Sequence, residues 1–264
     1  MRYHTLSALV SLGLVLAGCT TTTPTANEGP KGDEARLIKL AQDIERRGDR
    51  ATAASLYERA AKLSPDKVGA YSRLGEAQIA AGEPEQAAQS FRIALDASPN
   101  DGRALLGLGT AQLQSSQVES AARTLAVAAP IVKTSTAYNR LGTALILTGD
   151  GQGAERAFTQ ARNLDPSNLD TQSNLGLAQA ISGRTDAAVA TMRAVTQSPR
   201  AEARHFRNLM LVLMLGGQDK EAAAVAIPDY PEAEKKAFLA EARKVRGIKA
   251  PAARARAIGL LSSG

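Results

Sequence analysis

The fold of this chain is decided by a pattern of small and apolar residues that occurs twice with the same spacing. The first copy reads VGAYSRLGEAQIAAGEPEQAAQSFRIALDASP over residues 68–99, and the second reads STAYNRLGTALILTGDGQGAERAFTQARNLDP over residues 135–166. At matching offsets they carry the pairs Tyr71 and Tyr138, Leu74 and Leu141, Gly75 and Gly142, Gly82 and Gly149, Ala87 and Ala154, Phe91 and Phe158, Ala94 and Ala161, and Pro99 and Pro166. Such regular spacing indicates a structural repeat rather than a generic alanine-rich bundle.

The shared residues have clear roles in a pair of packed helices. Gly75 lets the two helices of one repeat cross closely, and Gly82 ends the first helix at a tight turn. Phe91 fills the gap toward the next repeat, and Pro99 stops the second helix. The pattern therefore predicts helix–turn–helix units that stack in a row.

This unit resembles the tetratricopeptide repeat (TPR), a helix–turn–helix of 34 residues. Successive copies are assigned to residues 34–67, 68–101, 102–134, 135–168, 169–201 and about 203–227, and the array to 34–227. The copy at 102–134 lacks the turn glycine and has Ser116 in its place. The resemblance implies an all-α fold, a right-handed solenoid of about five to six repeats with a C-terminal capping helix. The aromatic content of 3%, with no Trp, also favours packed helices over strands.

Residues 228–264 are predicted to form a basic, helical tail. The stretch 232–247 is expected to be a helix that caps the last repeat, because a terminal solenoid unit needs a polar outer face. A second short helix is expected over 251–261. From Glu232 onward eight Lys or Arg face three acidic residues, whereas the charges of 20–231 balance. The tail suits either a solvated helix surface or contact with acidic lipid headgroups or an acidic partner.

The N-terminus resembles a bacterial lipoprotein signal. A basic start at Arg2 and an apolar run over 6–16 lead to Leu16-Ala17-Gly18-Cys19, which contains the chain's one cysteine. The resemblance implies a signal peptide over 1–18, lipidation of Cys19 and a flexible tether over 19–33. The apolar run is too short for a spanning helix, which needs about 20 residues. The alternative is a chance or buried cysteine behind an ordinary secretory signal.

The TPR resemblance also implies where a partner would bind, because the first helix of each repeat lines the concave face. The candidate groove residues are Asn139, Thr143, Ile146, Leu147, Ser173, Leu177, Ile181, Arg204, Arg207, Leu211 and Met214. An apolar groove with polar edges suits an amphipathic helix or an extended peptide. These leucines and isoleucines could equally pack as core against the next repeat or the capping helix.

No set of residues suggests catalysis. Outside the signal the single histidine is His205, and neither metal-ligand spacing nor a glycine-rich phosphate loop is present, since Gly107 and Gly109 fall at repeat positions. Basic residues without interleaved aromatic residues do not suggest nucleic-acid binding. The sequence therefore predicts a binding protein that is not an enzyme and has no cofactor, metal, nucleic acid or small-molecule substrate.

The lipobox, the repeats and the basic helical end together resemble the TadD family of tight-adherence (Flp) pilus assembly proteins and the pilotins of type IV pili. This resemblance implies a scaffold that helps an outer-membrane secretin or another pilus component to assemble. Thr20 follows Cys19 where inner-membrane lipoproteins commonly have Asp, which favours lipid anchoring at the periplasmic face of the outer membrane. The alternative is a TPR lipoprotein that assists outer-membrane β-barrel insertion or peptidoglycan synthesis.

Overall fold

The computed structural model describes residues 30–227 and 230–263, and all regular secondary structure within these ranges is helical. The predicted signal peptide, Cys19 and the tether up to residue 29 lie outside the described residues. The helices are α1 (Pro30–Arg46), α2 (Arg50–Leu63), α3 (Lys67–Ala81), α4 (Pro84–Ala97), α5 (Gly102–Gln114), α6 (Val118–Val132), α7 (Ser135–Thr148), α8 (Gly151–Leu164), α9 (Leu169–Ile181), α10 (Thr185–Thr196), α11 (Ala203–Leu215), α12 (Asp219–Ala224), α13 (Glu232–Arg246) and α14 (Pro251–Ser263).

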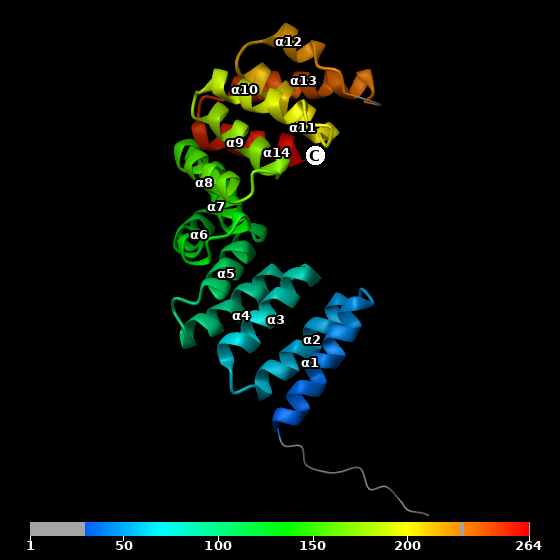
Figure 1. Cartoon of the computed structure of the whole chain (residues 1–264), viewed down its shortest axis with the longest axis vertical. Coiled ribbons are helices and arrows are strands. Elements are labelled where there is room, and N and C mark those ends of the chain that lie inside the picture. The colour runs from blue at the N-terminus through cyan, green and yellow to red at the C-terminus, as the bar shows by residue number, and fades with distance from the viewer. Residues whose placement is uncertain (1–29, 228–229, 264) are drawn as a thin grey trace, which may run out of the picture.

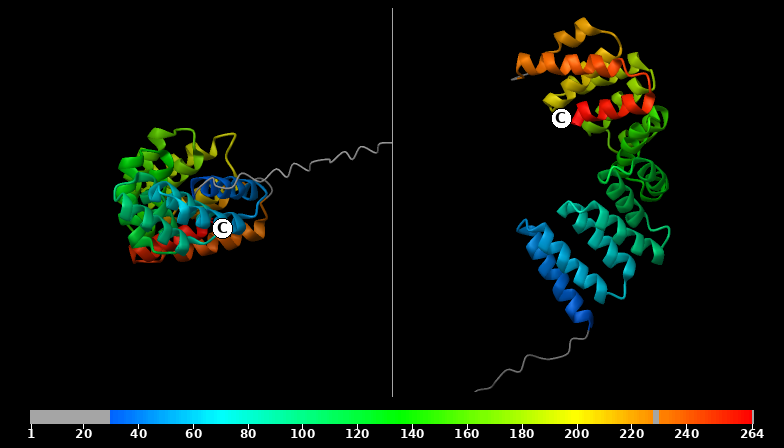
Figure 2. Two further views of the ribbon diagram at one scale, coloured as in Figure 1. Left: turned by 90° about the horizontal axis from the view of Figure 1, so that it is seen from below. Right: turned by 180° about the vertical axis from the view of Figure 1, so that it is seen from behind.

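Consecutive helices form hairpins, from α1 with α2 to α11 with α12, and each hairpin packs on the next. Figure 1 shows the hairpins stacked into one curved column, which begins at α1 and ends at α12 and α13. Figure 2 shows from behind that both ends of the column lie on the same side of its middle, so the column has a concave side. The predicted all-α solenoid is confirmed.

The first helix begins earlier than the sequence predicted. The tether was expected to reach residue 33, whereas α1 starts at Pro30. Proline suits the first position of a helix because its missing amide hydrogen would have no partner there. Asp33 lies in the first turn, where a negative charge interacts favourably with the helix dipole.

In four of the described hairpins a glycine of the first helix faces a large side chain of the second. A Cβ added at Gly142 would lie 2.7 Å from the Phe158 ring, and one at Gly75 would lie 2.7 Å from the Phe91 ring. The same arrangement brings Leu125 against Gly109 and Met192 against Gly176. These glycines therefore let each second helix approach its first helix, as the repeat pattern predicted.

Phe91 also contacts the next repeat, because a Cβ added at Gly107 would overlap its ring. The ring is fully buried between Gly75 and Gly107. The Gly107-x-Gly109 pair thus has a packing role: the first glycine receives Phe91 of the preceding repeat, and the second receives Leu125 of its own.

The turns inside the hairpins use a left-handed residue to end the first helix. Gly82 and Gly149 have φ values of +80° and +89° and cap α3 and α7. The third hairpin has Ser116 in this conformation, with φ of 57°. A side chain makes this conformation unfavourable by roughly 1–2 kcal/mol.

We therefore expect Gly82→Ala to lower the free energy of unfolding by about 1–2 kcal/mol through backbone strain alone, because a Cβ at Gly82 meets no atom within 4 Å. Ser116→Gly, the reverse change, should raise the free energy of unfolding by about 1 kcal/mol or less. The gain is limited because glycine also increases the conformational entropy of the unfolded chain. Urea unfolding of the two variants measures both effects. A loss of stability in Ser116→Gly would contradict this account.

The C-terminal helices fold back on the solenoid. As predicted, α13 covers the last repeat, where Phe238, Ala242 and Val245 are buried against α11. Helix α14 then returns along the column and packs against α7, α11 and α13 (Figure 2). It extends to Ser263, two residues beyond the predicted end.

The positive charges of this tail are mostly paired. The guanidinium groups of Arg243 and Arg246 bind the Asp219 carboxylate at 3.0 and 2.6 Å, and their hydrogen bonds hold its pKa below the ordinary value. Arg246 also donates to the Met214 carbonyl at the end of α11. Lys235, Lys244 and Arg256 have ion pairs as well. Arg243, Arg246 and Arg256 therefore join α13 and α14 to other helices, whereas Lys235 and Lys244 pair within α13.

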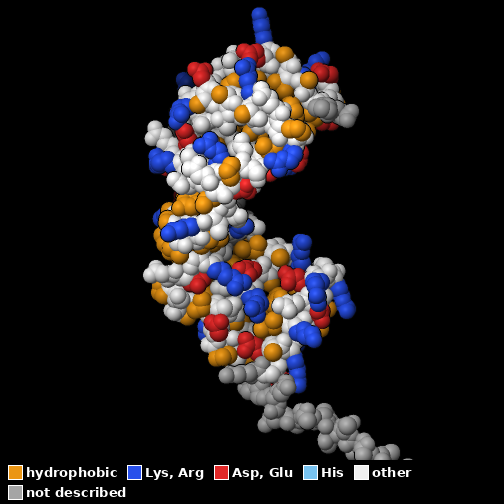
Figure 3. Space-filling view, viewed as in Figure 1, with side chains coloured by type: hydrophobic (Ala, Val, Ile, Leu, Met, Phe, Trp, Pro, Cys, Tyr) orange, Lys and Arg blue, Asp and Glu red, His pale blue; other side chains and the backbone are white. Residues whose placement is uncertain are grey.

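Exposed apolar side chains gather where the column is narrowest, over α6 (Figure 3). Val127 and Ile131 on this helix are about half exposed. No helix in the described part of the chain is both long enough and apolar enough to cross a bilayer.

Candidate functional site

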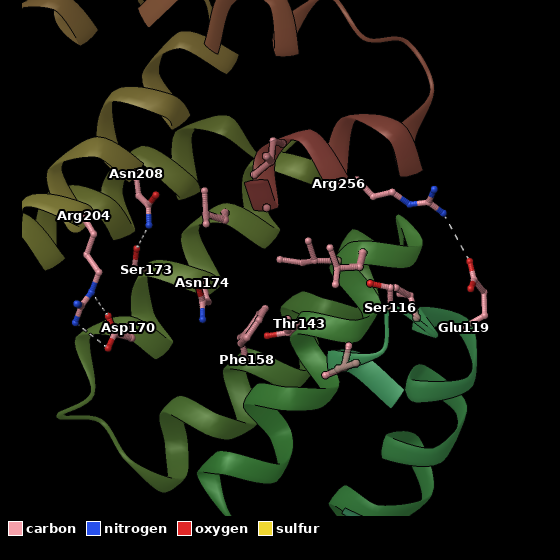
Figure 4. Close-up of a pocket in the computed structure, with 17 residues that line it drawn as sticks. Ser116, Glu119, Thr143, Phe158, Asp170, Ser173, Asn174, Arg204, Asn208 and Arg256 are labelled. Atoms are coloured by element: carbon pink, nitrogen blue, oxygen red, sulfur yellow. Dashed lines mark hydrogen bonds and ion pairs between the residues drawn. The ribbon is translucent and has the colours of Figure 1, made fainter. Parts of the chain in front are cut away.

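A pocket of about 900 Å³ lies on the concave side of the C-terminal half. Its walls come from the first helices of the last repeats, α7, α9 and α11, and from α14 (Figure 4). Leu113 of α5 and Glu119 of α6 complete one side. This volume lies near the upper end of the range usual for ligand sites.

The pocket has an apolar floor and a polar edge. The floor includes Ile146 and Leu147 of α7, Leu177 of α9 and Ile258 of α14. Between α9 and α11, Asn208 Nδ2 donates to Ser173 Oγ at 3.0 Å (Figure 4). A polypeptide segment is the ligand that uses both kinds of surface, because it carries apolar side chains and polar main-chain groups together.

The polar edge ends in a charged cluster between α9 and α11. The Arg204 guanidinium binds the Asp170 carboxylate with two hydrogen bonds, of 2.9 and 3.2 Å, and His205 Nε2 lies 3.0 Å from Asp170 Oδ1. Burial acts to raise the pKa of Asp170, but the hydrogen bonds and charges of Arg204 and His205 outweigh it and hold this pKa below its ordinary value. Asp170 therefore stays charged at neutral pH, where it ties α11 to α9.

Because the pKa of Asp170 is lower in the folded state, its contribution to stability is present above the ordinary aspartate pKa of about 3.9 and is lost as the pH falls through the folded value. We expect Asp170→Asn to reduce the free energy of unfolding at pH 7 by less than about 1 kcal/mol, since the pair is exposed. In thermal unfolding this difference from the wild type should shrink as the pH falls below the ordinary aspartate pKa and close once the pH lies below the folded value. Asp96→Asn, which removes a carboxylate without an ion pair in the described structure, is the control; an equal pH dependence in both variants would contradict the assignment.

His205 has a structural position. Its side chain is buried, its Nδ1 accepts a hydrogen bond from the Glu202 backbone amide at 2.9 Å, and its Nε2 faces Asp170. Both ring nitrogens are thus occupied in holding the start of α11. No group of side chains suited to a metal ion occurs among the described residues.

Helix α14 occupies one end of the concave side. Its backbone approaches α7 so closely that a Cβ added at Gly149 would lie 2.9 Å from Ala252 Cα, and Gly259 lies against Leu147. Arg256 faces Glu119 of α6 at 3.7 Å, with both side chains mostly exposed (Figure 4). Arg256, Ile258 and Gly259 therefore form part of the pocket wall.

Six of the predicted groove residues line this pocket: Thr143, Ile146, Leu147, Ser173, Leu177 and Arg204. The other five do not. Asn139 donates to Thr171 Oγ1 between α7 and α9, and Arg207 is half-buried. Ile181, Leu211 and Met214 are buried in the core, where α13 and α14 cover α11.

The pocket also contains residues that the sequence did not single out, chiefly Asn174, Asn208 and the three of α14. Asn174 and Asn208 stand at the same position of their repeats, one residue after the predicted Ser173 and Arg207. On α11 the residues that line the pocket are Arg204 and Asn208, one turn apart. Asn208 therefore takes the place that was predicted for Arg207, one residue earlier. The unbroken apolar run over 209–215 was the available signal that α11 is buried on all sides.

Comparison with known families finds two sequence profiles, both described as tetratricopeptide repeat. One matches residues 38–101 and 139–202, and the other matches residues 78–145. A comparison with curated proteins found no match.

Solved structures with the same fold include a tetratricopeptide repeat protein from Parabacteroides merdae, which has 15% identity and a TM-score of 0.65 over 88% of this chain and 100% of the other. YrrB, described as a TPR protein with an unusual peptide-binding site, has 19% identity and a TM-score of 0.60 over 72% and 99%. The structure from the functional characterisation of Pseudomonas aeruginosa pilF has 18% identity and a TM-score of 0.58 over 75% and 90%. At these identities the likeness establishes the fold alone.

Proposed function

The chain belongs to the tetratricopeptide repeat proteins, and from this premise we propose that it is a lipid-anchored scaffold that assists pilus assembly by binding an outer-membrane secretin. The observation that carries the proposal is the concave pocket, because its apolar floor and polar edge suit a polypeptide segment. The likeness to the pilF structure supports the pilus assignment, and that to YrrB supports a peptide-binding role.

In the proposed mechanism the partner segment lies along the first helices of repeats four to six. Its apolar side chains would contact Leu147 and Leu177, and its polar groups would meet Thr143 and the Arg204–Asp170 pair. Thr143 and Arg204 are exposed, so they are accessible to a partner without any rearrangement.

Anchoring completes the proposal. Lipidation of Cys19 would hold the scaffold at the periplasmic face of the outer membrane, as the lipobox and Thr20 favour. A partner in the same membrane would then meet the pocket at high effective concentration, so that a weak contact suffices. No enzymatic activity is part of this role.

The experiment is crosslinked co-isolation of the secretin from membranes of cells that produce the full-length chain. Thr143→Arg places a long charged side chain in the pocket, whereas Gln160→Arg makes the equivalent change at an exposed position of α8 that does not line it. We expect secretin recovery to fall at least tenfold for Thr143→Arg and to stay unchanged for Gln160→Arg.

A third variant, Cys19→Ser, tests the anchor. We expect it to remain folded but to leave the outer-membrane fraction, with impaired secretin multimers. Normal recovery of the secretin with Thr143→Arg would overturn the pocket assignment, and normal multimers with Cys19→Ser would overturn the anchor.

A further inference from the structure

Helix α14 differs from the other helices of the chain in what it packs against. Each hairpin of the column packs mainly on its sequence neighbours, whereas α14 reaches back to α7, more than a hundred residues earlier in the chain. It lies on the concave side, which is the face that solenoids use as a binding surface (Figure 2). We define the helix-binding seat as the surface that α14 covers at Glu119, Leu147 and Gly149.

We propose that α14 is an internal ligand of this seat, and that the partner of the scaffold inserts a helix of the same chemistry in its place. The inference rests on the proposed function and specifies its partner. Three contacts define that chemistry, and the small number of buried groups in α14 makes exchange possible.

The first contact is a close backbone approach. Ala252 lies against Gly149, and a Cβ added at Gly259 would lie 3.4 Å from Leu147 Cδ2, in ordinary van der Waals contact. Larger side chains at these two points would push the helix away. A competing helix must therefore carry Ala or Gly where it crosses α7.

The second and third contacts are one apolar and one charged side chain. Ile258 is fully buried between the seat and the core, and Arg256 pairs with Glu119 across the open side of the groove. Displacing α14 would leave Glu119 without its cation, so a basic residue at that point of the incoming helix would restore the ion pair. The expected partner segment is thus a short basic helix with small residues at the crossing and one branched aliphatic residue two positions after the Arg.

Few buried side chains fix α14 in place for a helix of its length. Only Ala255 and Ile258 among its described side chains are fully buried, and the Arg256–Glu119 pair is mostly exposed. The adjoining pocket is open beside Ile258 and Gly259, so an incoming helix can begin to bind before α14 leaves. The four residues 247–250 that join α13 to α14 keep the released helix nearby, at an effective concentration that is typically millimolar for short linkers.

The test uses a labelled synthetic peptide of residues 249–263 and the full-length protein. In the wild type the attached α14 outcompetes the peptide. Ile258→Glu in the protein places a charge at a fully buried position and should release α14. We expect the peptide to bind this variant at least tenfold more tightly than the wild type. A peptide that carries the Ile258→Glu change itself should bind neither protein.

Gly149→Ala and Gly82→Ala form a second, milder pair. Both add the same backbone strain at a left-handed cap, but only the Cβ at residue 149 meets α14. Because the Cβ at residue 149 lies in the seat itself, it should hinder the peptide as it hinders α14. Ile258→Glu combined with Gly149→Ala should therefore bind the peptide more weakly than Ile258→Glu combined with Gly82→Ala. Amide hydrogen exchange of Ile258→Glu should show lost protection over 251–263 with protection of α7 and α11 retained.

Peptide binding that is equal in wild type and Ile258→Glu, or absent from both, overturns the inference. Loss of protection throughout α7 and α11 also overturns it, because α14 would then be an integral part of the core. The secretin experiment with Thr143→Arg is independent of these results: the peptide can fill the seat even if the secretin is not the partner, and secretin recovery can depend on the pocket even if α14 never leaves.

Discussion

Phe158→Ala is expected to lower the free energy of unfolding by about 3–5 kcal/mol and to abolish binding in the pocket. The ring is fully buried, rests on Gly142 of α7 and belongs to the core cluster that joins α8, α9 and α11. Alanine would leave a cavity that the flanking helices can close only by shifting, and α7 carries Thr143, Ile146 and Leu147 of the pocket.

The matched control for this prediction is Phe91→Ala. Phe91 is equally buried but lies in the second repeat, away from the pocket. We expect a similar loss of stability with the pocket intact, because repeats of a solenoid interact mainly with their neighbours. Urea unfolding combined with amide exchange distinguishes the two effects. Loss of protection in α7 of the Phe91→Ala protein would contradict the local nature of this packing.

Gly107→Ala has the second-largest expected effect, a loss of about 1–3 kcal/mol from overpacking. Its Cβ would overlap the Phe91 ring, which has no room to retreat because Gly75 lies on its other side. At the position of Phe91 the next repeat has Leu125 instead, which packs against Gly109.

A double-mutant cycle tests this second prediction. Phe91→Leu costs stability alone, but it should recover at least half of the loss in Gly107→Ala by freeing space for the new methyl group. Urea midpoints of the four proteins give the coupling energy. Additive losses would show that Gly107 and Phe91 do not compete for the same space.

Much of the fold could be predicted because the repeat pattern records local packing. Gly75, Gly82 and Phe91 have the roles that their spacing indicated, since each acts within one hairpin or on the next. The same reasoning predicted α13 from its apolar residues among charges and its position after the last repeat.

The candidate site was predicted less completely because it depends on a contact between distant parts of the chain. A short helix over 251–261 was expected, but nothing local in its small residues indicates that it packs against α7. Together with α13, the returning α14 covers α11, so that Leu211 and Met214 are buried and Asn208 lines the pocket instead. On α9 the predicted Ser173 and Leu177 do line the pocket.

The backward course of α14 also affects how the molecule responds to force. A solenoid stretches like a spring, since each repeat can rotate slightly against its neighbour. In the C-terminal half α14 joins α7 to α11 and α13 and so acts as a brace across three repeats, whereas contacts from α1 to α5 run between near neighbours. A pull applied to the two ends of the column would therefore lengthen the N-terminal repeats first and leave the pocket undistorted until α14 gives way.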